Sequence, residues 1–208
     1  MVFEFNNVKI KWLGHSAFQI KKEVTIYIDP FEIEETEPAD LILVTHDHYD
    51  HCSPDDIVKI QTDDTIIVAP AVAAKKLAGN TKIIKEGQTL KLKNVLIHAV
   101  PAYNINKKFH PKEAGHVGYV ITINGIKIYH AGDTDLIPEM EVIAADIALL
   151  PVSGTYVMTA HEAAEATKKI QPKIAIPMHY GSIVGSEKDA NEFRDKAHAE
   201  VKILKKNE

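Results

Sequence analysis

The chain has 208 residues, of which 45% are hydrophobic and 25% are charged, as in an ordinary globular protein. This composition excludes a disordered chain, and the length predicts a single domain over residues 1–208. A net charge of −5 without a polybasic run argues against binding to duplex nucleic acid or to an anionic membrane. One cysteine stands against eleven histidines, so we expect imidazole and carboxylate groups, not thiolates, to bind any metal.

Membrane and secretion signals are not recognised in the sequence. The first residues lack a long apolar region after a basic start, so they do not read as a signal peptide. The most apolar stretch, residues 65–74, is too short to cross a bilayer and contains Pro70. We therefore expect a cytoplasmic protein.

The first part of the chain predicts short strands and two helices. Ser53 is a typical N-cap and Pro54 a typical first helical residue, so a helix is predicted to start there. A second helix is expected over 71–79, closed by Gly79. Runs of β-branched residues bounded by turn residues predict strands. They cover 8–14, 17–20, 24–28, 41–44 and 65–70, with a hairpin turn at 21–23.

The second part mixes hairpins with helices. The clearest helix spans 159–170, because Thr159 and Glu162 form a capping box and Pro172 follows its end. Asn124-Gly125 is a strong two-residue turn signal. The remaining predicted elements are a hairpin over 89–100 turning near Lys93-Asn94, a hairpin over 118–133, strands over 147–152 and 174–179, and a helix from Ser186 to about Ala199. Early hairpins followed by interleaved helices predict an α/β or α+β layered domain.

Five predicted strands end directly in polar or turn residues. Ligand sites in layered α/β domains tend to lie beyond the carboxyl ends of strands, so these ends are candidate site positions. They are 25–30, 41–51, 126–133, 147–156 and 174–181. The first and third are similar, because each is an aliphatic strand with a tyrosine that is followed by an aspartate. This similarity hints at an internally duplicated fold.

The segment Thr45–His51, with the sequence THDHYDH, contains four strong potential metal ligands: His46, His48, Asp50 and His51. It follows an apolar strand and leads into the helix near Ser53. Nitrogen and carboxylate ligands grouped in this way suit a pair of metal ions in a hydrolytic site. A solvated loop is the weaker interpretation, because so many clustered imidazoles would repel one another when partly protonated.

THDHYDH, together with AGDTD (131–135) and PMHYG (177–181), resembles the metallo-β-lactamase superfamily. The resemblance runs from Gly14-His15 to His179, and it is strongest to the branch that includes ascorbate-6-phosphate lactonase. It implies a four-layer αββα sandwich with metal ions at one edge of the sheets.

The resemblance also implies the ligands of two divalent metal ions, zinc first, with manganese or iron as alternatives. Matched residue by residue to the motifs of that superfamily, His46 and His48 would bind the first ion, and Asp50, His51 and His179 would bind the second. Asp133 would bridge both ions. The usual third histidine of the first ion is displaced here. His98 falls about two residues early in its strand, and we favour His110, in the long loop 102–116, over it.

Other residues receive supporting or ordinary roles. The resemblance places His15 near the metal rim, where it is a candidate for the catalytic machinery together with Asp50. Asp29 and Asp47 are candidates to hold the second ring nitrogen of a ligand histidine. Cys52 is expected to be a small buried residue. The remaining histidines are expected to be structural or exposed: His116, His130, His161 and His198.

The predicted function is hydrolysis of an ester, lactone or phosphoester bond by a metal-bridged hydroxide. Lys107, Lys108 and Lys112 favour a small anionic substrate, and a homo-oligomer is possible. Three alternatives remain open: an RNA-processing nuclease, an iron-based redox enzyme, and a non-catalytic metal-binding module. The retained His48 argues against the redox enzyme, and the negative net charge argues against the nuclease.

Overall fold

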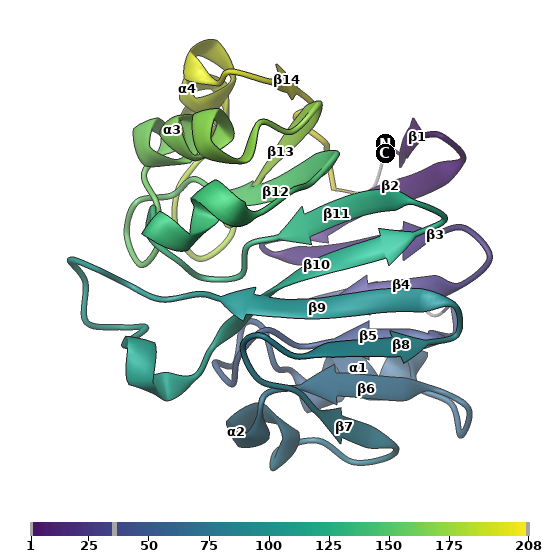
Figure 1. Cartoon of the computed structure of the whole chain (residues 1–208). Coiled ribbons are helices and arrows are strands. Elements are labelled where there is room, and N and C mark those ends of the chain that lie inside the picture. Colours follow the sequence, from purple (N-terminus) through teal and green to yellow (C-terminus); the bar gives the residue numbers. More distant parts are fainter. Residues whose placement is uncertain (1, 35–36, 207–208) are drawn as a thin grey trace. The chain divides into compact units, whose positions relative to one another are not determined.

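The computed structural model describes residues 2–34 and 37–206. The chain divides into two compact units, and a single domain over 1–208 stays a prediction. The first unit runs up to Ile84 and includes the segment from Leu204, and the second spans Lys85–Ile203. Figure 1 shows the strands and helices of each unit. Among the described residues, no helix is long and apolar enough to cross a membrane.

The first unit contains a seven-stranded sheet in which the strands follow one another in chain order. The first four are antiparallel and the last three continue in parallel. Its strands are β1 (Val2–Phe5), β2 (Val8–Gly14), β3 (Ala17–Lys21), β4 (Thr25–Ile28), β5 (Leu41–Leu43), β6 (Ile66–Ala69) and β7 (Thr81–Ile83). Parallel neighbours need crossover connections, and helices supply two of them.

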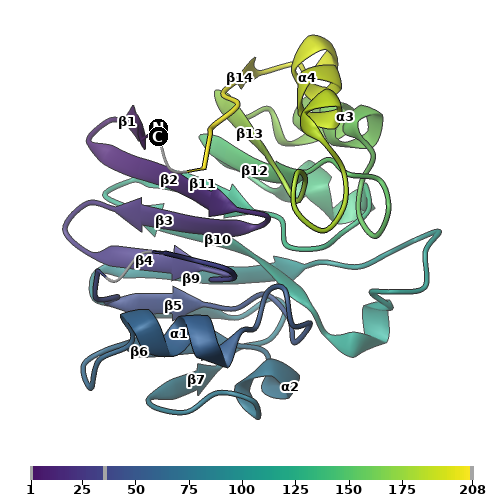
Figure 2. The same ribbon diagram turned by 180° about the vertical axis from the view of Figure 1, so that it is seen from behind.

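Helix α1 (Pro54–Ile60) connects β5 with β6 and covers one face of this sheet, as Figure 2 shows. The helix begins as predicted, with the Ser53 hydroxyl accepting a hydrogen bond from Asp56 N. Ile57 and Ile60 pack in one apolar cluster with residues of the sheet, among them Tyr27 and Ile42. This packing fixes the segment between β5 and α1, which is the segment that holds THDHYDH.

The second unit repeats the pattern of the first, with four antiparallel strands followed by three parallel ones. Its strands are β8 (Thr89–Leu92), β9 (Val95–Pro101), β10 (Val117–Ile123), β11 (Ile126–His130), β12 (Ile147–Pro151), β13 (Ile174–Met178) and β14 (Glu200–Val201). Both predicted hairpin turns are present: Lys93-Asn94 and Asn124-Gly125 adopt the positive φ angles that a type I′ turn requires.

Helices α3 (Ala160–Ile170) and α4 (Glu187–Lys196) connect the parallel strands of the second unit and lie together in Figure 1. The predicted capping box of α3 is confirmed, because Thr159 N donates to Glu162 Oε2 and Glu162 N donates to Thr159 Oγ1. Two short 3₁₀ helices, η1 (Lys112–Ala114) and η2 (Pro138–Val142), lie in the connections.

Strands β4 and β11 hold the same position in their sheets, each being the fourth strand, where antiparallel pairing changes to parallel. An aspartate follows each strand, Asp29 after β4 and Asp133 after β11. The similarity between residues 25–30 and 126–133 therefore corresponds to equivalent places in two units of the same topology.

Two helix ends differ from the predictions. Helix α2 (Ala71–Ala74) is much shorter than 71–79, because only Ala73 is buried and little apolar surface favours a longer helix. Gly79, at φ +99°, serves the turn before β7 instead of ending a helix. Helix α4 ends at Lys196 because Ala197 is extended and the chain turns toward β14. The short strands β1, β7 and β14 were not predicted from the sequence.

Candidate metal centre

Asp29 anchors the polar segment of the first unit. It is fully buried directly after β4, and its φ of +45° lies in the left-handed region. Thr45 donates to it twice, from its backbone N over 2.8 Å and from its hydroxyl over 2.6 Å. His51 Nδ1 donates to Asp29 Oδ2 over 2.8 Å. One carboxylate thus holds both ends of the segment Thr45–His51, which also contains His46, His48 and Asp50.

The tautomer of His46 follows from these contacts. Because the hydroxyl hydrogen of Thr45 is used toward Asp29, the contact of 3.0 Å between Thr45 Oγ1 and His46 Nδ1 requires the imidazole to donate. His46 Nε2 then carries a lone pair and lies 3.1 Å from His48 Nδ1. His46 is buried, and its ring lies 4.1 Å from that of His51.

Asp50 and His15 are in direct contact in the same unit. His15 Nε2 lies 3.0 Å from Asp50 Oδ2, and His51 Nε2 lies 3.7 Å from the same oxygen. His15 is buried with a φ of +49°, and the ring of Phe31 packs on it edge to face. The histidine cluster of the first unit consists of His15, His46, His48, Asp50 and His51.

Asp133 is the centre of a second group, in the second unit. It is almost fully buried, and its Oδ2 lies 3.1 Å from His179 Nε2 and 3.4 Å from His110 Nε2. The turn between β11 and Asp133 is held by a hydrogen bond from Gly132 N to His130 Nδ1. The aspartate cluster of the second unit consists of His110, Asp133 and His179.

The outer ring nitrogens of the second cluster are also held by protein oxygens. His179 Nδ1 lies 3.0 Å from Ser153 Oγ, and His110 Nδ1 lies 3.2 Å from Asn104 Oδ1. His179 follows β13 with a φ of +60°. A non-glycine residue in the left-handed region costs free energy, and such strain gathers at functional sites. His15, Asp29 and His179 share this feature.

Both clusters fit a divalent metal ion by donor type and spacing. Two donor atoms on one tetrahedral ion lie about 3.3 Å apart, given metal–nitrogen distances of about 2.0 Å. The contacts within each cluster, from 3.0 to 3.7 Å, agree with this value. Four histidines present Nε2 to other candidate ligands while a protein oxygen holds Nδ1, which is the usual arrangement of ligand histidines.

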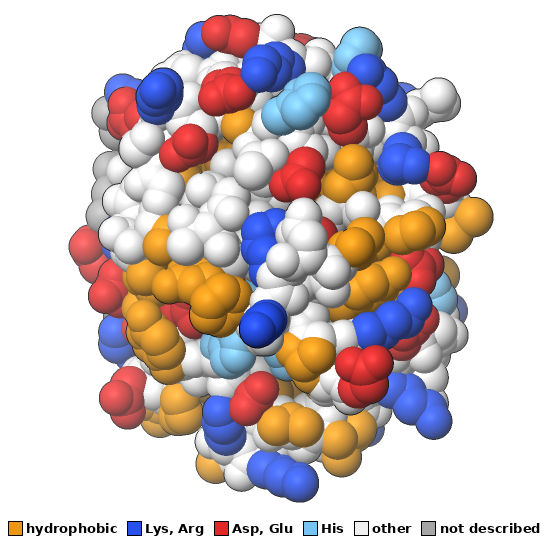
Figure 3. Space-filling model, turned by 90° about the vertical axis from the view of Figure 1, so that its left-hand side faces the viewer, with side chains coloured by type: hydrophobic (Ala, Val, Ile, Leu, Met, Phe, Trp, Pro, Cys, Tyr) orange, Lys and Arg blue, Asp and Glu red, His pale blue; other side chains and the backbone are white. Residues whose placement is uncertain are grey.

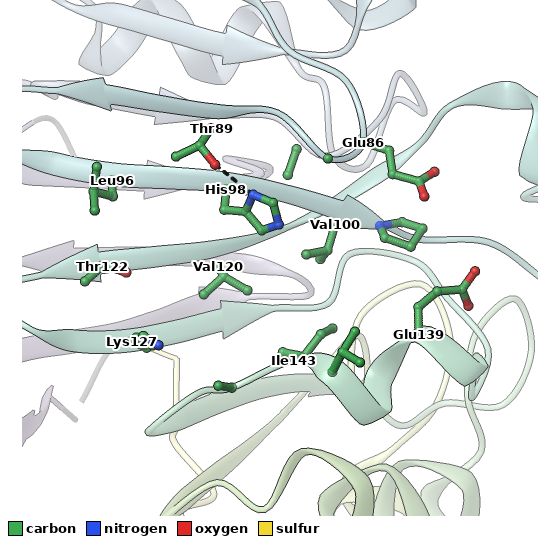
Figure 4. Close-up of a pocket in the computed structure, with 15 residues that line it drawn as sticks. Glu86, Thr89, Leu96, His98, Val100, Val120, Thr122, Lys127, Glu139 and Ile143 are labelled. Atoms are coloured by element: carbon green, nitrogen blue, oxygen red, sulfur yellow. Dashed lines mark hydrogen bonds between the residues drawn. The ribbon is translucent and has the colours of Figure 1, made fainter.

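His98 lies at a different place in the second unit. It lines a cavity of about 480 Å³ on one face of the sheet, together with apolar side chains such as Leu96, Val120 and Ile143 (Figure 4). Its Nδ1 contacts Thr89 Oγ1 over 2.8 Å. Of the described residues that line this cavity, none belongs to the aspartate cluster.

Asp47 and Cys52, which lie within or beside the segment of candidate ligands, each have defined surroundings. Asp47 forms an ion pair with Lys76 over 2.8 Å, whereas Asp29 holds His51. Cys52 is buried as expected, and burial, with a smaller contribution from the charge of Asp29, raises the pKa of its thiol to about 11. Its proton is therefore retained at neutral pH.

The remaining histidines divide by exposure. His161 and His198 are exposed, whereas His130 and His116 are buried. The His116 ring packs on the ring of His110 at 5.5 Å. Its only sequence signal is its position at the end of the loop 102–116.

The sequence alone did not identify Thr45, Ser153 or Asn104 as partners of the candidate ligand histidines. Thr45 directly precedes His46, which is a local signal. Ser153 is 26 residues from His179, and Asn104 is six residues from His110 within the loop 102–116. The fold of the chain is what brings each pair together.

Comparisons with known proteins identify the family to which the chain is similar. A family model described as a beta-lactamase superfamily domain matches residues 9–179. A UPF0173 metal-dependent hydrolase of Thermococcus onnurineus is 36% identical, over 97% of this chain and 98% of that protein. A second, from Thermoplasma acidophilum, is 39% identical over 90% of each chain.

Solved structures point the same way. A candidate metal-dependent hydrolase from Parabacteroides distasonis has a TM-score of 0.87 and 34% identity, covering 99% of this chain and 98% of its own. Igni18, a metallo hydrolase from Ignicoccus hospitalis, has a TM-score of 0.80 and 28% identity, covering 97% and 96%.

The fold and the family match define a metallo-β-lactamase-type domain, which confirms the resemblance and the α/β layered fold class predicted from the sequence. Within this class, the chain belongs to the UPF0173 family of metal-dependent hydrolases.

Proposed function

We propose that the protein is a binuclear metal-dependent hydrolase of small molecules. Seven side chains would hold two divalent metal ions, with zinc as the first candidate and manganese or iron as alternatives. They are His46, His48 and His110 for one ion, Asp50, His51 and His179 for the other, and Asp133 for both. The observation that carries the proposal is the common orientation of four histidines, each with Nδ1 held by a protein oxygen.

Bound divalent ions lower the pKa of water and polarise the bond to be cleaved. The protein's own contribution is to orient the ligands and to move a proton. Asp50 Oδ2 accepts a hydrogen bond from His15 Nε2, which holds the carboxylate in one orientation. Asp50 would accept a proton from attacking water and pass it to the leaving group. We therefore propose Asp50 and His15 as the catalytic pair.

The bond cleaved is proposed to be an ester, a lactone or a phosphoester, in a small and anionic substrate. Two of the three loop lysines already form ion pairs, Lys107 with Asp135 over 2.5 Å and Lys112 with Glu139 over 2.9 Å. Their charge is partly neutralised, so we expect only a modest preference for an anion.

We further propose that an apolar group of the substrate contacts an aromatic pair formed by this loop and the segment after β12. Phe109 directly precedes His110 and is 52% exposed. Its ring packs edge to face on that of Tyr156, with the ring centres 4.6 Å apart. This aromatic pair would contact an apolar group beside the bond that is cleaved.

Surface charge supports a small-molecule substrate over a nucleic acid. Figure 3 shows Lys and Arg side chains interspersed with Asp and Glu side chains over one face of the molecule. The net charge of the chain is −5. Phosphate backbones are bound by clustered positive charge, so the RNA-nuclease alternative is less well supported. A cytoplasmic location and a homo-oligomer stay predictions.

The test is a pair of double variants that each remove two histidines. His46→Ala/His48→Ala should lose at least one bound metal ion per chain and most hydrolysis of a panel of phosphoesters, lactones and thioesters. The matched control, His161→Ala/His198→Ala, removes two exposed side chains and should keep both properties. Metal content by mass spectrometry and initial rates report the result. Full metal content and activity in the first variant would refute the assignment.

A further inference from the structure

The loop 102–116 is held by one buried carboxylate. Asp135 is 2% exposed and accepts hydrogen bonds from Ile105 N over 2.8 Å and Asn106 N over 3.3 Å. The Asn104 amide and the Lys107 ammonium also donate to it, over 3.2 and 2.5 Å. Four successive residues thus converge on Asp135. A carboxylate accepts about four hydrogen bonds, so its capacity is filled by this loop.

Asn104 connects Asp135 with His110. Its Nδ2 donates to Asp135 Oδ1 and, over 2.9 Å, to the carbonyl of Tyr156. Its Oδ1 accepts from His110 N over 3.0 Å and lies 3.2 Å from His110 Nδ1. The backbone N of Asn104 donates to His110 O over 2.7 Å. Because both ends of the amide are engaged, its oxygen must face the imidazole, and His110 Nδ1 must donate.

His110 needs this support more than the other candidate ligands do. His46 and His179 each follow the end of a strand closely, whereas His110 lies inside a long loop. Ordering a loop costs conformational entropy, so a ligand on a loose loop binds its ion weakly. The Asp135–Asn104 contacts are made within the protein, so that ordering is complete before an ion binds.

We propose that Asp135, acting through Asn104, is the positioning residue that fixes the ring and the tautomer of His110 and thereby sets the affinity of one metal ion. The inference rests on the proposed function for the role of His110 as a ligand. In this role, Asp135 contacts neither the reacting atoms nor the substrate. Loss of a partner that orients a ligand typically lowers metal affinity 10- to 100-fold.

The experiment compares variants of the full chain. Asp135→Asn weakens the whole anchor. Asn104→Ala removes the amide that joins His110 to Asp135 and to the Tyr156 carbonyl, and it leaves the other three donors on Asp135. The matched control, Lys112→Met, breaks a different attachment of the same loop, the ion pair with Glu139. Each metal-free protein is titrated with Co²⁺, whose visible spectrum reports the coordination of each ion.

We expect the wild-type protein and Lys112→Met to bind two ions, and both other variants to bind one ion normally and the second 10- to 100-fold more weakly. Two ions bound with wild-type affinity by Asn104→Ala would overturn the inference.

A second measurement separates this inference from the proposed function. The ¹⁵N shifts of the His110 ring, assigned with His110→Gln, report its tautomer in the metal-free protein. They should show protonated Nδ1 in the wild type and a mixture in Asn104→Ala. An unchanged tautomer would overturn the positioning role. Absence of metal binding by the wild type would instead refute the proposed function and leave the tautomer result interpretable.

Discussion

Asp56 shows how a single charged side chain joins two segments of the first unit. Its carboxylate accepts hydrogen bonds from the Ser53 hydroxyl, from Lys59 Nζ, and from the backbone of Glu32 and Ile33. Burial opposes ionisation of Asp56. The hydrogen bonds from Lys59, Ser53 and the backbone outweigh it and hold the pKa below its usual value of 3.8. The start of α1 is thereby attached to the segment after β4.

This lowered pKa predicts a pH-dependent contribution to stability. Asp56→Asn should lower the free energy of unfolding at pH 7 by about 1–3 kcal/mol, because buried donors lose a charged acceptor. A carboxyl whose pKa is lower in the folded state stabilises fully above its unfolded value and loses this effect as the pH falls through the folded value. The difference between wild type and variant should therefore shrink below about pH 4.

Urea denaturation from pH 7 to pH 3 measures this difference. Asp55→Asn is the matched control, since Asp55 is the neighbouring exposed carboxylate of the same helix turn, and it should change little. A difference for Asp56→Asn that is constant across this pH range would contradict the assignment.

For single residues, the sequence distinguishes the proposed ligand histidines from the other histidines better than it identifies the side chains that contact them. His46, His48 and His51 lie within one short motif, so spacing alone singles them out. The orientation of His51 depends on Asp29, which is 22 residues away, and that of His179 on Ser153, which is 26 residues away. Such contacts arise from strand order, and a single sequence does not encode strand order in a local pattern.

Among the elements, β10 and β11 show a constraint that hydrophobic patterning does not express. Gly118 lies in β10 without a positive φ, so no turn requires glycine there. A Cβ at this position would lie 2.8 Å from the carbonyl oxygens of both His130 and Ala131. Those carbonyls belong to the end of β11 and the turn before Asp133. The close approach of the two backbones thus fixes the start of the turn that carries Asp133.

We expect Gly118→Ala to lower the free energy of unfolding by about 1–3 kcal/mol, because backbone atoms must move to accept the methyl group. The shift should also weaken metal binding, since it moves the turn that carries Asp133. Thr122→Ala, in the same strand and facing the cavity of Figure 4, is the control and should leave metal binding unchanged. Thermal unfolding and metal titration measure both effects. A stable Gly118→Ala protein with normal metal affinity would contradict this role.

Turns and helix starts that neighbouring residues determine were predicted correctly. Boundaries and strands that depend on burial or on pairing with a distant strand were not. The Asn124-Gly125 turn and the α3 capping box are encoded by neighbouring residues, and both are present. The end of α2 depends on how little of its surface is buried, and the strand β14 depends on pairing with β13. Neither property can be read from a window of the sequence.

For the whole molecule, the repeated topology explains why the candidate ligands are dispersed along the chain. Each unit has an aspartate after its fourth strand, but the two have different surroundings. Asp29 holds Thr45 and His51, whereas Asp133 contacts His110 and His179. The aspartate of the first unit thus supports a segment of candidate ligands, and we propose that the aspartate of the second unit is itself a ligand.

Because the proposed ligands come from both units, metal removal should destabilise the chain as a whole. A ligand that binds only the folded state stabilises it by about 2.7 kcal/mol at a free concentration 100 times its dissociation constant. Incubation with a chelator should therefore lower the unfolding temperature in scanning calorimetry by several degrees. Zinc or manganese should restore it. Magnesium should not, because it prefers oxygen ligands to imidazoles.

The His46→Ala/His48→Ala protein provides the internal control for this experiment. It lacks two proposed ligands, so the chelator should lower its unfolding temperature less than that of the wild type. If the chelator shifts the two proteins equally, the ions that stabilise the chain are bound elsewhere, and His46 and His48 are not among their ligands. If the wild type unfolds at the same temperature with and without the chelator, metal binding is not linked to folding, and the proposed centre is wrong.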